Sequence, residues 1–125
     1  MLDKKYYEGY EGEEQIKIWC EEGCKENGLL VWNGFFDTIL EGCFKSEFQK
    51  GGIIECYYNH DGFYDGKWEM KYPHIVLDEL KTFDEDVLDA KNQGITKIAK
   101  DIIGQLIYFI DTAISKNAKV YIEYE

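Results

Sequence analysis

The sequence predicts an α+β fold in which an antiparallel sheet of about five strands packs against one long helix. Three observations predict this fold. Residues 14–72 are rich in aromatic and β-branched side chains and contain scattered Gly and Asn, as strands and turns do. Residues 92–116 carry apolar side chains at helical spacing, and residues 119–124 alternate between apolar and polar. A chain of 125 residues can bury one core, so we expect a single domain, 1–125.

The first strand is expected at residues 15–20. Its alternating pattern places Ile16, Ile18 and Cys20 on one face of the strand. Residues 21–28 are polar and contain two glycines, so we expect a turn or loop there.

Asn33-Gly34 lies between two apolar runs and predicts a β-hairpin. The segment 37–48 after it is ambiguous. Either the second hairpin strand continues, or Asp37 caps a short helix. That helix would bury Ile39, Leu40, Cys43 and Phe44. We favour the strand.

Residues 53–58 and 67–72 are interpreted as two further strands. The turn-forming residues 59–62 and 65–66 connect them. After the single Pro of the chain, residues 75–77 form another short expected strand.

The long C-terminal helix, about 92–116, has the clearest pattern. Its apolar side chains recur at spacings of three and four, which predicts a buried stripe. The stripe consists of Ile95, Ile98, Ala99, Ile102, Ile103, Leu106, Ile110, Ala113 and Ile114. A short helix ending at Ala90, capped by Thr82 or Asp84, is expected before it. The final strand, 119–124, is half-buried.

The charge is strongly one-sided. The chain has 25 Asp and Glu against 14 Lys, no Arg, and a net charge of −11. By our count, residues 1–89 hold 21 of the acids and 9 of the Lys, whereas residues 90–125 hold 4 and 5. Such a field attracts cationic partners and repels nucleic acid and anionic membranes. We therefore expect a basic protein partner.

Catalytic and metal-binding signatures are lacking. Cys20 and Cys24 have a spacing that zinc sites use, but Cys43, Cys56, His60 and His74 supply no second close pair of ligands. No glycine-rich phosphate loop occurs. We expect no enzymatic activity, no cofactor and no metal. The four thiols are expected to be free and mostly buried.

The N-terminal residues lack an apolar leader, so we expect a cytoplasmic protein. Charged residues interrupt the longest apolar-rich stretch, 95–114, so no membrane-spanning helix is expected.

Acidic residues gather in clusters beside aromatic residues, a combination that suits a protein interface. There are four clusters: Glu11, Glu13 and Glu14; Glu21, Glu22 and Glu26; Asp61, Asp65 and Glu69; and Asp78, Glu79, Asp84, Glu85, Asp86 and Asp89. We select the partner-binding residues from the last two clusters and the aromatic residues beside them. They are Asp61, Tyr64, Asp65, Trp68, Glu69, Asp78, Glu79, Asp84, Glu85 and Asp86.

In size, acidity and α+β pattern the chain resembles the immunity proteins of bacterial toxin systems, including contact-dependent growth inhibition. The resemblance implies an inhibitor that binds and occludes a basic toxin, for instance a nuclease, and that is a monomer or weak dimer when free. Two alternatives stay open. One is an adaptor that dimerises through an edge strand such as 120–125, and the other is an enzyme that uses the cysteines and histidines.

Overall fold

The computed structural model describes residues 2–22, 25–43, 50–59, 66–84 and 93–124. Five strands form one sheet in the order β1-β3-β2-β5-β4. The strands are β1 (Leu2–Tyr6), β2 (Gln15–Glu22), β3 (Lys25–Trp32), β4 (Trp68–Glu69) and β5 (Val120–Tyr124).

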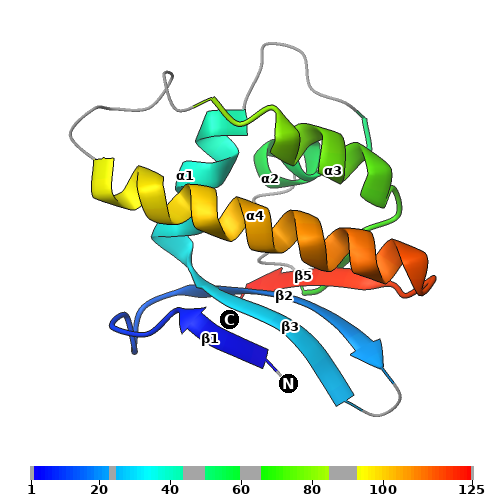
Figure 1. Ribbon diagram of the computed structural model, residues 1–125, viewed down its shortest axis with the longest axis horizontal. Helices are drawn as coiled ribbons and strands as arrows, with labels where there is room; N and C mark the ends of the chain where they lie inside the picture. The colour runs from blue at the N-terminus through cyan, green and yellow to red at the C-terminus, as the bar shows by residue number, and fades with distance from the viewer. Residues whose placement is uncertain (1, 23–24, 44–49, 60–65, 85–92, 125) are drawn as a thin grey trace.

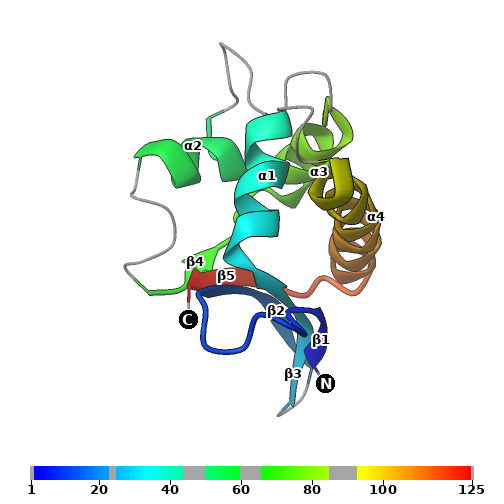
Figure 2. The same cartoon turned by 90° about the vertical axis from the view of Figure 1, so that its left-hand side faces the viewer.

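Helices cover one face of this sheet, as Figures 1 and 2 show. They are α1 (Asn33–Cys43), α2 (Ile53–Asn59), α3 (Pro73–Lys81) and α4 (Gln93–Ser115). In Figure 2, α1 stands between α2 on one side and α4 on the other. The α+β class, the long C-terminal helix and the final strand are therefore confirmed.

The sheet is mixed, so the prediction of a purely antiparallel sheet was wrong. Strand β2 is antiparallel to both β3 and β5, but β1 runs parallel to β3. The difference arises because β1 does not pair with its neighbour in sequence, β2, and instead joins the other side of β3. Strand β5 lies between β2 and β4, so it is not the edge strand that the adaptor alternative requires.

Helix α1 replaces the predicted hairpin and second strand. Asn33 begins the helix, and its backbone N–H donates to the Glu14 carbonyl at 3.0 Å. The helix buries an apolar stripe at spacings of one, three and four residues, which suits a helix and not a strand. The buried apolar residues are Phe35, Phe36, Ile39, Leu40 and Cys43.

Two other predicted strands are also helices. Residues 53–58 belong to α2, which buries Ile53, Ile54 and Cys56. Residues 75–77 belong to α3, which begins at Pro73, a residue suited to the first helical turn. The predicted strand 67–72 is reduced to β4, and the predicted short helix ending at Ala90 falls mainly outside the described residues.

The core lies between the sheet and the helices. Helix α4 lies across the sheet and contributes most of its predicted stripe, although Ile98 is exposed and Thr96 is buried in its place. The largest fully buried side chains come from β2, β3, β5 and all four helices. They are Phe36, Ile16, Ile18, Ile39, Leu40, Ile54, Leu80, Ile102, Ile110, Ile122, Val31 and Val76.

Gly28 of β3 allows the two central strands to pair closely. It is paired with Trp19, and a Cβ at this position would lie 2.0 Å from the Ile18 carbonyl oxygen and 2.7 Å from the Trp19 Cα. Both atoms belong to the backbone and cannot move without shifting β2. Glycine is therefore required here by a close approach of two strands.

Candidate functional site

A groove with an acidic lining opens where the β1–β2 loop meets the start of α1. Its volume is about 420 Å³. The loop supplies two glutamates, β3 supplies an indole at its end, and the first turns of α1 supply an amide and a carboxylate. We call this the acidic groove, lined by Gly12, Glu13, Glu14, Trp32, Asn33, Gly34 and Asp37.

Aromatic packing holds the loop in place. The Tyr10 ring stacks on Trp32, with centroids 4.1 Å apart and planes within 9°, and both rings meet the edge of Phe35. The Tyr7 hydroxyl donates to the Glu13 carbonyl at 2.8 Å. These contacts preorganise the two glutamates, so a partner would meet a loop that is already ordered.

Asp37 is fixed by its neighbours on two sides. The Tyr57 hydroxyl of α2 donates to one carboxylate oxygen, and the Asn33 amide donates to the other at 3.4 Å. Burial raises the pKa of Asp37, the hydrogen bond from Tyr57 lowers it, and the Glu14 charge raises it again. The net shift is upward because burial, the largest of these causes, disfavours the charged carboxylate.

The acidic surface continues from the groove along α1. Glu41 is exposed one turn after Asp37, and Tyr58 of α2 is 44% exposed nearby. Burial raises the pKa of Tyr58, and the charges of Glu41 and Asp37 raise it further. An exposed tyrosine thus lies near carboxylates. Tyrosine is enriched in protein interfaces, and charges at an interface rim steer an oppositely charged partner.

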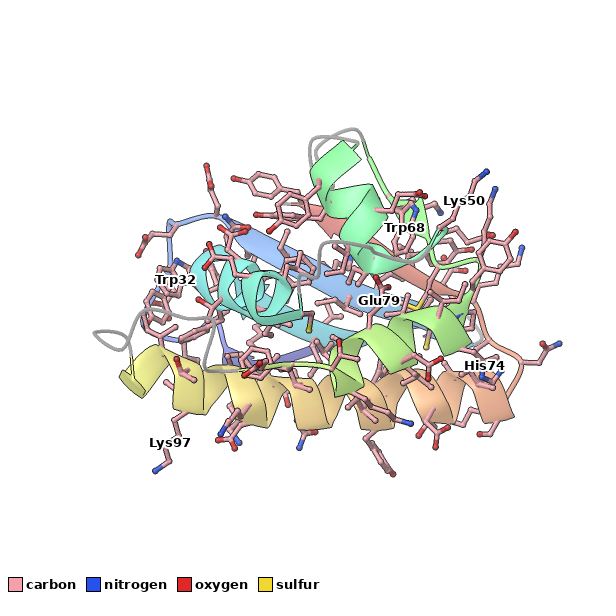
Figure 3. All side chains as sticks on the ribbon, turned by 90° about the horizontal axis from the view of Figure 1, so that it is seen from above. Trp32, Lys50, Trp68, His74, Glu79 and Lys97 are labelled. Carbon is pink, nitrogen blue, oxygen red and sulfur yellow. The ribbon has the colours of Figure 1, made fainter. Side chains whose placement is uncertain are left out.

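No Lys among the described residues forms an ion pair with a groove carboxylate. Two lysines pair elsewhere: Lys17 with Glu123 at 3.5 Å and Lys119 with Glu69 at 3.6 Å. In Figure 3, Trp32 of the groove and Lys50 lie toward opposite ends of the view. The groove is therefore a region of uncompensated negative charge within the described part of the chain.

The partner-binding residues chosen from the sequence lie away from this groove. Trp68 and Glu69 form β4, Asp78 is exposed on α3, and Asp84 follows α3 and donates its backbone N–H to the Gly42 carbonyl at 2.9 Å. The other selected residues lie outside the described residues: Asp61, Tyr64, Asp65, Glu85 and Asp86.

Glu79 cannot serve as a surface contact, which corrects its selection. It is only 5% exposed and faces α2, as Figure 3 shows. One carboxylate oxygen, Oε1, accepts the backbone N–H of Ile53 at 2.8 Å. A Cβ added at Gly52 would lie 2.1 Å from the same oxygen. The inward position follows from helical spacing, because Glu79 lies three residues after the buried Val76.

The described thiols have the properties of core residues. Cys20, Cys43 and Cys56 are buried and are not joined in disulfides within the described part of the chain, which confirms that part of the expectation. Burial raises the pKa of Cys56 to about 11, and the Glu55 charge acts in the same direction. Reactive thiols have lowered pKa values, so Cys56 is of the structural kind. Within the described ranges, no group of three His, Cys, Asp or Glu converges as a metal site.

A second hollow of about 360 Å³ lies between α4 and the β2–β3 hairpin. Its lining is mainly apolar and includes Cys20, Leu29, Phe109 and the exposed Tyr108.

Among the helices that the structure describes, none combines the length and the apolar character that a membrane span requires.

No protein-family model matches the chain, and no curated protein or solved structure shows significant similarity to it.

Sequence reasoning missed part of the groove. Glu13 and Glu14 belong to an acidic cluster visible in the sequence. Trp32, in contrast, lies in the predicted hairpin, and Asp37 begins the segment 37–48, for which we favour a strand over a helix capped by Asp37. The signal that identifies α1 as a helix was present in the spacing of Phe35, Phe36 and Ile39.

Proposed function

We propose that this protein is an inhibitor that binds a basic protein through the acidic groove. The observation that carries the proposal is the convergence of Glu13, Glu14 and Asp37 beside the Trp32 indole, with no compensating Lys among the described residues. Like charges held together in this way favour a partner that supplies cations.

The partner that fits best is a bacterial toxin that binds nucleic acid, such as a nuclease. Such enzymes hold phosphates with Lys and Arg side chains. Carboxylates in the groove would pair with those cations, and the body of the protein would occlude the substrate cleft. The resemblance in size, acidity and α+β pattern to toxin immunity proteins supports this function, which acts inside the producing cell.

Preorganisation supports the proposal further. The loop that carries Glu13 and Glu14 is held by the Tyr10–Trp32 stack, and Asp37 is held by Tyr57 and Asn33. A binding surface that is ordered in advance loses little conformational entropy on association. Negative charge at its rim also accelerates encounter with a basic protein.

The test starts with immobilised protein and an extract of the source organism at low salt. Any basic protein recovered is purified and assayed for nuclease or other toxic activity with and without the inhibitor. We expect stoichiometric inhibition and an affinity that falls steeply with salt. A recovered protein that keeps full activity in the complex, or binding that is insensitive to salt, would contradict the proposal.

A further inference from the structure

Helix α2 is attached to its neighbours by side-chain contacts at both ends. It has only seven residues, too few to be stable as an isolated helix. Ile53, Ile54 and Cys56 anchor its buried side. At each end of α2, one polar contact joins it to a carboxylate of another helix.

At the start of α2, the contact comes from α3. Glu79 accepts the Ile53 backbone N–H at 2.8 Å and is also hydrogen-bonded to the backbone of Ile54. Its second oxygen, Oε2, is buried and has no hydrogen-bond partner among the described residues. A buried carboxylate with one unsatisfied oxygen is costly in its charged form.

Toward the end of α2, the contact goes to α1. Tyr57 donates its hydroxyl hydrogen bond to Asp37, and its ring meets the edge of Phe36 with centroids 6.3 Å apart. Asp37 also lines the acidic groove, so the position of α2 determines whether that carboxylate is hydrogen-bonded to Tyr57.

The charged groups that face these two carboxylates are acidic as well. Glu55 of α2 acts on Glu79, while its own carboxylate accepts the Gly51 N–H at 3.0 Å. Glu14 of the β1–β2 loop acts on Asp37. No cation among the described residues forms an ion pair with either carboxylate. Negative charges from α1, α3 and the β1–β2 loop therefore lie around α2.

We propose that α2 is a pH-sensitive latch, which docks more firmly as the solution is acidified and loosens as it becomes alkaline. The direction follows from linkage. Burial is the main cause that raises the pKa of Glu79, and the Glu55 charge acts in the same direction. A carboxyl with a higher pKa when docked takes up a proton on docking. Its contribution is complete below its ordinary pKa and is lost as the pH rises through the raised one.

The experiment is backbone hydrogen exchange at pH 4.5 and pH 7.5 on the whole protein, corrected for intrinsic exchange rates. The amides of residues 56–58 in α2 are compared with those of residues 102–110 in α4 as an internal reference. We expect the protection of α2 relative to α4 to be several-fold greater at pH 4.5. If the pKa of the carboxyl is higher by one when α2 is docked, this relative protection can change by at most about a factor of ten.

Two variants with the same change in charge separate the latch from general effects of charge. Glu79→Gln keeps the acceptor oxygen but cannot titrate, so its relative α2 protection should vary much less with pH. Asp78→Asn lies next to it on α3 but is exposed, and it should behave as the wild type does. A wild-type ratio that is constant or falls on acidification, or a Glu79→Gln ratio as pH-dependent as that of the wild type, would overturn the proposal. Neither result depends on whether a toxin partner exists.

Discussion

Glu79 of α3 caps the start of α2 by accepting the Ile53 backbone N–H at 2.8 Å, across 26 residues of sequence. Helix starts leave backbone N–H groups without intrahelical partners, and a nearby side chain usually satisfies them. Here the cap comes from a different helix, so one carboxylate both satisfies the start of α2 and joins it to α3. A residue from a distant helix thus supplies the cap that a residue adjacent in sequence usually supplies.

Removing the Glu79 carboxylate should destabilise the protein. Glu79→Ala leaves the Ile53 N–H buried without an acceptor, and we expect the free energy of unfolding to fall by about 1–3 kcal/mol. Urea denaturation measures this change. Glu79→Gln retains an acceptor oxygen, so it should lose less. Equal losses in the two variants would show that the hydrogen bond to Ile53 contributes little.

The stability lost with the Glu79 carboxylate should depend on pH. Because the pKa of Glu79 is raised in the folded protein, ionisation opposes folding, and wild-type stability falls relative to Glu79→Gln as the pH rises above about 4.5. Denaturation midpoints of both proteins from pH 4 to pH 8 measure the difference. If wild-type stability instead rises relative to Glu79→Gln over this range, folding lowers the pKa of Glu79, which contradicts this prediction.

The hydrogen bond between Tyr57 and Asp37 should be measurable by a double-mutant cycle. Tyr57→Phe removes the hydroxyl and should lower the free energy of unfolding by about 1 kcal/mol, more if Asp37 remains charged. The cycle pairs it with Asp37→Ala, which removes the acceptor, and Glu41→Ala on the same helix controls for the lost charge. A coupling energy near zero between residues 37 and 57 would mean that the contact does not hold α2.

Gly28 and Gly104 should respond in opposite ways to alanine. A Cβ at Gly28 would meet the backbone of Ile18 and Trp19, so Gly28→Ala should destabilise the protein by about 2 kcal/mol or more. A Cβ at Gly104, in the middle of α4, meets nothing within 4 Å. Gly104→Ala should stabilise the protein by about 0.5–1 kcal/mol, because alanine favours a helix. Thermal or chemical denaturation checks both.

The long helix and the strands β2 and β5 could be predicted because their apolar periodicity is unambiguous. Residues 15–20 alternate, and Ile102, Leu106 and Ile110 recur at spacing four. Short helices were harder, because Asn33-Gly34 is a turn signal and the aromatic residues after it favour strands. In the structure Gly34 instead packs against the Trp32 ring, where a Cβ would lie 2.4 Å from it.

Strand β1 and the acidic groove depend on tertiary structure and left little trace in the sequence. Of the five residues in β1, only Tyr6 is buried, so no alternation marks the strand. Glu14 and Asp37 are 23 positions apart, and the pairing of β2 with β3 brings them together. The burial of Glu79 could have been inferred once α3 was recognised as a helix, since Val76 and Leu80 share its face.

The central claim is that the acidic groove binds a basic partner, and the most direct measurement compares two doubly neutralised variants. Glu13→Gln with Glu14→Gln removes two charges from the groove, whereas Asp101→Asn with Asp111→Asn removes two exposed charges from α4. Calorimetric titration of each with the captured partner, at two salt concentrations, gives the affinities. We predict binding about tenfold weaker, or worse, and a smaller salt dependence for the groove variant only. Equal effects of the two variants, or an unchanged affinity of the groove variant, would contradict the account.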